Sequence, residues 1–198
     1  MSARHGGEKD FIPALPDTGA GALTNTGARL RLRDHSRPTL AQRVLHSLRL
    51  LLVAVWLGAA VFFSAAVAPS AFAVLPSREL AGALVARTLT ILNVGGAACG
   101  LLLLAGVVVG RRSARLPALL LEALALAAMT GAAFVGHFVI AARMSSLRAQ
   151  MGKPIEEVAA ADPLRVAFNV LHGQSVMAMS IAMAAAAVAL FLVARRTK

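Results

Sequence analysis

The chain has 198 residues, of which 58% are hydrophobic and 15% charged, and its mean hydropathy is +0.73. A water-soluble fold cannot hide that much apolar surface. The net charge of +11 is spread over segments that flank apolar stretches, not gathered on one face, which argues against a nucleic-acid-binding protein.

Four apolar stretches divide the chain, at residues 50–68, 88–110, 116–142 and 173–194. Each approaches or exceeds the roughly 20 residues that cross the hydrocarbon of a bilayer as a helix, and lipid offers no partners to unpaired backbone groups. The sequence therefore predicts an all-α, polytopic membrane protein, built as an antiparallel bundle of four transmembrane helices. The first stretch is too long, and lies too far along the chain, for a cleaved secretory signal.

The distribution of Lys and Arg predicts the orientation of this bundle. Twelve cations near the spans fall on the side that holds the N-terminal arm, and six fall on the opposite side. The positive-inside rule then places both termini in the cytoplasm and the protein in the cell inner membrane. The first set is Arg29, Arg31, Arg33, Arg37, Arg43, Arg49, Arg111, Arg112, Arg115, Arg195, Arg196 and Lys198; the second is Arg78, Arg87, Arg143, Arg148, Lys153 and Arg165.

The N-terminal arm differs from the rest of the chain. Residues 1–38 mix Gly, Pro, Thr, Arg and Asp with no sustained apolar period, so we expect a disordered, basic cytoplasmic tail. Residues 39–198 then form the transmembrane domain. Thr39 is an N-cap for the first helix, which we expect Pro69 to end, and Ser77 is an N-cap for the second helix.

Stop and start signals on the far side indicate long helices. Gly152 and Pro154 end the third helix and Asp162-Pro163 begins the fourth, which leaves residues 152–162 as the loop. Helices two, three and four are then longer than the hydrocarbon is thick, so we expect them to extend beyond the outer surface. Their expected contacts there are Leu80, Leu84, Met144, Leu147, Leu164 and Phe168.

Polar side chains in membrane spans are costly, so each is a candidate for function or for helix packing. The predicted topology brings one group of them to a common depth in the outer leaflet. We expect this outer polar cluster to bind a small ligand or to stabilise an assembly. Arg143 and Arg165 are placed to hold the carboxylates of a haem or of an anionic ligand, or else are interfacial anchors. The cluster consists of Asn93, His137, Asn169, His172, Gln174 and Ser175.

His137 and His172 are predicted on neighbouring antiparallel helices, where neutral imidazoles ligate transition metals or haem iron. Two ligands are an incomplete site for zinc, and no Cys or Asp stands nearby on the helices to complete it. The alternative is that both imidazoles hydrogen-bond to neighbouring groups and fix the packing of the helices. A haem or transition-metal cofactor is therefore one of two interpretations of this pair.

Glu122 is the only acid within a span, close to the cytoplasmic end of the third helix. An ionisable group at this depth suits a proton or cation path, which Glu122 would share with His137. The alternative is an ion pair between Glu122 and Arg111, Arg112 or Arg115 at the interface.

Small residues recur at a spacing of four on the second helix, which lets two helices approach closely. They serve packing within the bundle or, as the alternative, a homo-oligomer. The spaced glycines are Gly96 with Gly100, and Gly106 with Gly110.

Cys99 is the only cysteine, which excludes an intrachain disulfide, and we interpret it as a small apolar helix residue.

Two motifs in the chain look familiar. The first is Trp56-Leu57-Gly58 with Phe62-Phe63, Ala68-Pro69 and Phe72; the second is Phe168-Asn169-Val170-Leu171-His172-Gly173-Gln174-Ser175. Both motifs resemble those of a bacterial domain-of-unknown-function membrane family related to human transmembrane protein 205. The resemblance covers about residues 44–194, and it implies four helices and no assigned activity. The family also looks distantly similar to membrane proteins of copper resistance and haem synthesis, and only His172 carries over from its motif.

The sequence contains no phosphate loop, nucleophile elbow, HExxH motif or dinucleotide fingerprint, so enzymatic activity of the soluble type is not expected. We rank three functions. The first is a non-enzymatic inner-membrane protein whose outer polar cluster binds a small ligand or stabilises an assembly. The second is a haem- or metal-handling protein that uses His137 and His172, and the third is a small proton- or cation-coupled transporter that uses Glu122.

Overall fold

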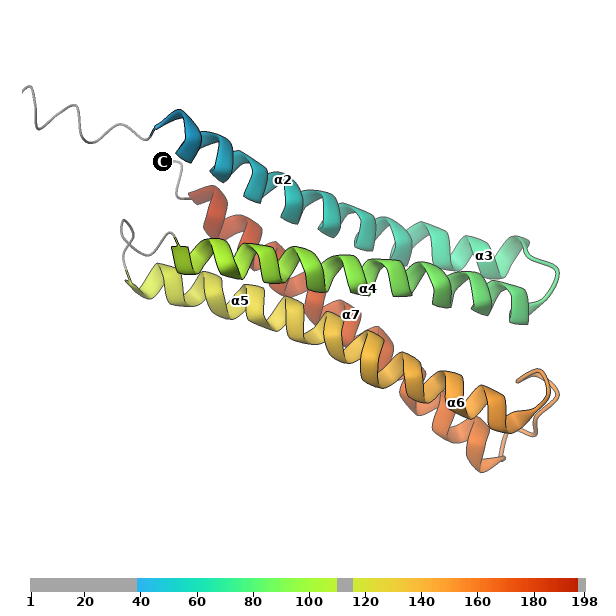
Figure 1. Ribbon diagram of the computed structural model, residues 1–198. Coiled ribbons are helices and arrows are strands. Elements are labelled where there is room, and N and C mark those ends of the chain that lie inside the picture. Colours follow the sequence, from blue (N-terminus) through green and yellow to red (C-terminus); the bar gives the residue numbers. More distant parts are fainter. Residues whose placement is uncertain (1–38, 110–115, 196–198) are drawn as a thin grey trace, which may run out of the picture. The chain divides into compact units, whose positions relative to one another are not determined.

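The computed structural model describes residues 39–109 and 116–195, and every regular element in these ranges is a helix (Figure 1). The first span is continuous through α2 (Leu40–Phe62), the π-helical segment η1 (Phe63–Val67) and α3 (Ala68–Val74). The second is α4 (Arg78–Val109). The third runs through α5 (Leu116–Val135), the π-helical segment η2 (Gly136–Ala141) and α6 (Ala142–Met151), and the fourth is α7 (Pro163–Arg195).

All four spans are long and apolar enough to cross a membrane, which confirms the predicted four-helix membrane fold. Their described lengths of 35, 31, 36 and 33 residues correspond to about 46–54 Å of helix, against about 30 Å of hydrocarbon. Many large apolar side chains point away from the other helices, among them Val55, Leu102, Leu124 and Phe191. The chain is a multi-pass membrane protein in which lipid covers these side chains.

The four-helix unit comprises Val44–Lys198, and of the first unit, Met1–Arg43, the structure describes only the start of α2. Within the four-helix unit the long helices run antiparallel (Figure 1). The backbones of α4, α5 and α7 approach each other closely in that order, α3 lies against α4, and α6 lies against α7. We call the end of the unit that holds Arg49 and Arg195 the termini end, and the end that holds residues 152–162 the loop end.

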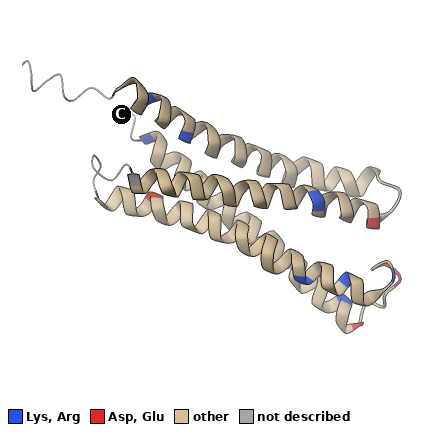
Figure 2. Ribbon diagram, in the orientation of Figure 1, with Lys and Arg blue, Asp and Glu red and all other residues tan. Residues whose placement is uncertain are grey.

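Charged residues lie mainly towards these two ends, and the middle of the unit is almost free of them in the described ranges (Figure 2). The helices pack through stripes of buried residues spaced alternately three and four apart, which is the pattern of antiparallel bundles. On α7 the stripe is mostly alanine, so α5 and α7 lie close together. That stripe is Met179, Ala182, Ala186, Ala189 and Val193, and the stripe on α5 is Leu119, Glu122, Leu126, Met129 and Ala133.

The predicted helix ends are confirmed where the chain turns. At the start of α2 the backbone N–H of Gln42 donates to Thr39 Oγ1 over 3.3 Å, and the backbone N–H of Thr39 donates to Gln42 Oε1 over 2.9 Å. These two bonds form a reciprocal capping box. The Leu80 N–H donates to Ser77 Oγ. Gly152 has φ of 61° after α6, a left-handed conformation that glycine adopts at low cost.

Two expectations at the loop end were wrong. Pro69 does not end the first span, because the π-helical turn of η1 precedes it and carries the helix on to Val74. A wider turn accommodates a residue that has no backbone N–H to donate. Leu80 and Leu84 are exposed and not packed between the extended helices, whereas Phe168 is buried and Met144, Leu147 and Leu164 are half-buried.

Candidate functional site: two polar centres in the helix bundle

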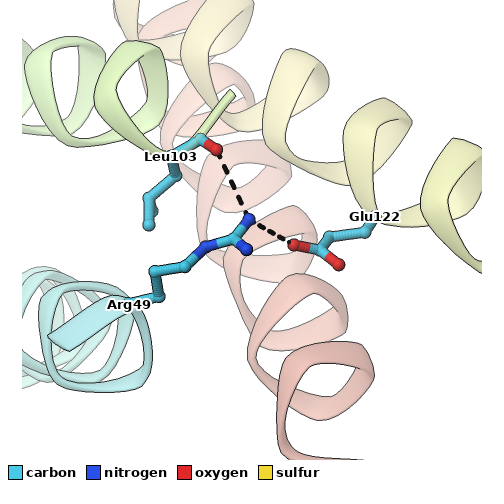
Figure 3. A network of polar contacts seen from close by, with 3 residues as sticks. All are labelled: Arg49, Leu103 and Glu122. Carbon is cyan, nitrogen blue, oxygen red and sulfur yellow. Dashed lines mark hydrogen bonds and ion pairs between the residues drawn. The ribbon is translucent and has the colours of Figure 1, made fainter. Parts of the chain in front are cut away.

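The first polar centre lies near the termini end, where three helices converge on one guanidinium (Figure 3). Arg49 Nη2 on α2 lies 2.7 Å from Glu122 Oε1 on α5, and it also donates to the Leu103 carbonyl of α4 over 3.4 Å. We call Arg49, Leu103 and Glu122 the Arg49 centre. The Arg49 side chain thus connects the first, second and third spans.

The Arg49 centre is almost closed to the surroundings. The Glu122 side chain has 0% exposure and that of Arg49 has 15%. Burying a charge in an apolar interior is unfavourable unless an opposite charge compensates for it. The Arg49 guanidinium and the Glu122 carboxylate therefore compensate each other's charge inside the membrane domain.

Local sequence explains why these two side chains face each other. Arg49 precedes the buried residues Val53, Trp56 and Ala60 at spacings of four, three and four, so it belongs to the inward stripe of α2. The side chain passes beside Gly106 on α4, where a Cβ would make ordinary van der Waals contact with it, 3.7 Å from Arg49 Nε. The long arginine side chain thus crosses from α2 to α5 over a glycine.

Two turns further along α2, Trp56 joins this helix to α4. Its indole Nε1 donates to the Leu92 carbonyl over 2.9 Å, and the ring lies against Gly96. Gly100, one turn further along α4, lies against Thr130 of α5. The small residues of α4 therefore serve packing within this chain. Gly106 faces Arg49, and Gly110 lies outside the described residues.

The second polar centre lies where α4 meets the third span. The Asn93 side chain packs against Gly136, on which a Cβ would lie 3.1 Å from Asn93 Nδ2. Asn93 is only 5% exposed, yet none of the hydrogen bonds within residues 39–109 and 116–195 involves its amide. We call Asn93, Gly136 and His137 the Asn93 centre.

His137 follows Gly136 in the π-helical segment η2 and is half-buried. Its Nδ1 is buried and has no hydrogen-bond partner among the described residues, and its ring meets that of Phe138 edge-on with centroids 4.6 Å apart. π-helical turns within α-helices occur often at functional sites. The Asn93 centre therefore places a nearly buried amide against a distorted helix, whose next residue, His137, carries a buried nitrogen without a partner among the described residues.

The other residues of the predicted outer polar cluster have different surroundings. Asn169, His172 and Gln174 are exposed on α7 and Ser175 is half-buried. Arg143 is exposed, whereas Arg165 Nη1 donates to the Val158 carbonyl over 2.6 Å. That hydrogen bond fastens the loop at residues 152–162 to α7. The sequence did not indicate this structural role of Arg165.

A metal site of three or more His, Cys, Asp or Glu side chains is absent from the part of the chain that the structure describes. The two histidines differ in burial, since His172 is exposed and His137 is half-buried. Between Glu122 and His137, the inward face of α5 carries Ala125, Leu126, Met129 and Ala133, all apolar and buried. This conformation therefore has an apolar barrier between the Arg49 centre and the Asn93 centre along α5.

Comparison with known proteins gives one family. A family model described as a domain of unknown function, DUF4149, matches residues 51–153, which is just over half of the chain. The chain belongs to the DUF4149 family. No curated protein and no solved structure matches it.

The DUF4149 match bears on both polar centres. It contains Trp56, Asn93, Glu122 and His137, but it begins after Arg49 and ends before His172. The motif at Leu171-His172-Gly173, on which the resemblance partly depended, therefore lies outside the matched region. The family confirms a membrane domain of unknown function, which the sequence had indicated.

Sequence reasoning missed Arg49, although a signal for it was present. Arg49 was counted among the cations that set topology, and Glu122 was paired with residues 111–115, which lie outside the described ranges. The spacing from Arg49 to Val53 and Trp56 places the arginine on the inward face of its helix. A cation on that face requires an acid on a facing helix, and Glu122 is the only acid in a span.

Proposed function

We propose that this DUF4149 protein is a non-enzymatic component of the inner membrane, with both termini in the cytoplasm, whose Asn93 centre binds a small polar ligand. The observation that carries the proposal is the pairing of Asn93, a residue only 5% exposed whose amide makes no hydrogen bond within the described ranges, with His137, whose buried Nδ1 has no hydrogen-bond partner there. An amide in an apolar interior loses about 1–3 kcal/mol without a partner, so a bound molecule that supplies one is favoured.

The chemistry of the centre limits the ligand. One amide and one imidazole offer donors and acceptors but no fixed negative charge, and the buried side chains in the described part of the bundle are apolar apart from Asn93 itself and Glu122. A divalent cation would bring charge that these two side chains do not neutralise. The ligand is therefore a small neutral molecule that both donates and accepts hydrogen bonds.

The haem- or metal-handling alternative depends on His137 and His172 acting together. The exposure of His172 gives it less support than the Asn93 centre gives the first proposal. A resemblance to human transmembrane protein 205, and a homo-oligomer, stay predictions. A homo-oligomer would use a face other than Gly96 and Gly100, which Trp56 and Thr130 cover.

The experiment is native mass spectrometry of the protein released from nanodiscs. We expect a non-lipid mass to be retained by the wild type, to be lost in Asn93→Leu, and to persist in the matched control Asn169→Leu, which makes the same change on an exposed face of α7. Gly136→Ala should also lose it, because the new Cβ crowds the Asn93 amide.

Two results would overturn the proposal. One is a folded wild type that retains no mass beyond lipid, and the other is an Asn93→Leu protein that retains the same mass as wild type. Absorption spectra and elemental analysis of the same samples test the alternative. A Soret band or a stoichiometric metal that disappears in both His137→Ala and His172→Ala would favour haem or metal handling instead.

A further inference from the structure

Arg148 on α6 contacts two other helices at the loop end. Its guanidinium carbon Cζ lies 5.1 Å from the centroid of the Phe168 ring on α7, a cation–π contact with a residue that is only 7% exposed. The guanidinium also lies against the backbone of α4, because a Cβ on Gly82 would lie 3.0 Å from Arg148 Nη2. Contacts with α4 and α7 therefore hold the charged group of α6 in place.

The Arg148 side chain spans a distance that the backbones leave. The third span lies close to α4 along α5 and η2 but not along α6. Gly82 is buried and has no side chain, so the guanidinium takes the space beside the α4 backbone that a side chain would fill. A glycine at this position lets one arginine link α4, α6 and α7.

No acid compensates for the charge of Arg148 in the part of the chain that the structure describes. Arg148 forms no ion pair and donates no hydrogen bond within residues 39–109 and 116–195. Its side chain is exposed, so an anion from outside can reach it. The acids at the loop end that form no ion pair with it are Glu79, Glu156, Glu157 and Asp162.

Two further arginines flank the contacts of Arg148. Arg165 precedes Phe168 by one turn on the same face of α7, and Arg78 precedes Gly82 by one turn on the same face of α4. Lys and Arg residues gather towards the loop end of α6 and α7 (Figure 2). Like charges on neighbouring helices repel, so an anion between them is favoured. We call Arg78, Arg148 and Arg165 the loop-end arginine cluster.

The depth of Arg148 indicates which anion is available to it. The 26 residues from Glu122 to Arg148 correspond to about 39 Å of helix, against about 30 Å of hydrocarbon and about 40–45 Å of whole bilayer. With the Arg49 centre at the edge of the hydrocarbon near the termini end, Arg148 lies at the depth of the headgroups near the loop end. The phosphates of lipids are the anions at that depth.

We propose that the loop-end arginine cluster binds the phosphate of an anionic lipid, with Arg148 as its principal donor. A guanidinium presents its N–H groups in a planar fork that matches two phosphate oxygens, and basic pockets between membrane helices bind lipid headgroups. The site is separate from the Asn93 centre and does not depend on the function proposed for it.

The test is native mass spectrometry of the full chain in detergent, titrated with phosphatidylglycerol or phosphatidylcholine of the same acyl chains. We expect the wild type to bind phosphatidylglycerol about tenfold more tightly, and Arg148→Gln to lose this preference. Arg143→Gln is the matched control, because it removes the same charge from an exposed arginine of the same helix. It should bind within about twofold of the wild type.

A second variant separates a positioned guanidinium from a merely positive surface. Gly82→Leu keeps every charge but fills the space beside α4 that the Arg148 guanidinium occupies, so we expect it to lower the preference about fivefold. Gly95→Leu is its control on the same helix, since a Cβ there meets nothing within 4 Å. If Arg148→Gln does not fold, Gly82→Leu carries the test alone.

Three outcomes would overturn the proposal. The first is equal binding of the two lipids by the wild type. The second is an equal loss in Arg143→Gln and Arg148→Gln, which would show attraction by surface charge without a site. The third is displacement of phosphatidylglycerol by millimolar inorganic phosphate but not by chloride of equal ionic strength, which would assign the site to free phosphate. None of these outcomes bears on ligand retention at Asn93, so the two proposals fail separately.

Discussion

Arg49 Nη2 lies 2.7 Å from Glu122 Oε1, and this single ion pair joins the first span to the third across the second. Removal of Arg49 withdraws a compensating charge from the fully buried Glu122 carboxylate, which costs about 3 kcal/mol, whereas removal of both charges leaves an apolar contact. We therefore expect Arg49→Leu to lower the free energy of unfolding by about 3 kcal/mol. The double variant with Glu122→Leu should lie within about 1 kcal/mol of wild type.

The measurement is unfolding by denaturing detergent in mixed micelles. Arg43→Leu is the matched control, because Arg43 is exposed on the same helix. A double variant that is less stable than Arg49→Leu would contradict the account.

Gly96 is required by the Trp56 indole. A Cβ on Gly96 would lie 2.7 Å from Trp56 Cε2 and Nε1, which forces the ring or the helix to move. We expect Gly96→Ala to destabilise the protein by about 2 kcal/mol in the same unfolding assay. Gly95→Ala is the control, because a Cβ there meets nothing within 4 Å, and it should be neutral or slightly stabilising. Equal effects of the two substitutions would refute this role of Gly96.

Trp56 contributes a hydrogen bond as well as a ring. Trp56→Phe keeps an aromatic ring but loses the Nε1 donor to the Leu92 carbonyl, so we expect a loss of about 1 kcal/mol. Trp56→Leu should cost more, because it also removes ring contact with Gly96. Unfolding free energies that do not distinguish Trp56→Phe from wild type would show that the bond to Leu92 is dispensable.

Arg165 is predicted to hold the loop at residues 152–162 in place. Its Nη1 donates to the carbonyl of Val158, a residue that is only 3% exposed. Loss of this bond in Arg165→Met should raise the rate of cleavage after Glu156 or Glu157 by a Glu-specific protease about fivefold. Arg143→Met, which changes an exposed arginine, should cleave at the wild-type rate. Equal cleavage rates in the two variants would show that Arg165 does not hold the loop and is only an interfacial anchor.

The helices and their ends were predictable because their signals are local. Apolar length, the cap at Thr39 and the pair Asp162-Pro163 each act within a few residues, and the structure places helix ends where they indicated. The prediction that Pro69 ends the first helix was wrong, because the effect of a proline depends on the turn before it. A π-helical turn precedes Pro69 and lets the helix continue.

The polar centres were only partly predictable because they depend on contacts between helices. Depth alone grouped Asn93 and His137 with Asn169 and His172, but depth does not say which face of a helix each residue takes. His172 lies seven residues before the buried Met179, on the same face of α7, yet it is exposed, so neither its depth nor its helical face predicted its surroundings. For Arg49 the opposite error was made, since its helical face pointed inward and only its charge was considered.

Four crossings with both termini on the cytoplasmic side form the central claim, and cysteine accessibility tests it most directly. Replacing Cys99, the only cysteine, by Ala gives a background for single cysteines at Gln42, Pro76, Lys153 and Arg195. We expect a membrane-impermeant maleimide to label intact cells at Pro76→Cys and Lys153→Cys, and to label Gln42→Cys and Arg195→Cys only after permeabilisation. Labelling of Gln42→Cys and Arg195→Cys from opposite sides, or of Pro76→Cys from the cytoplasm, would contradict the four-crossing topology.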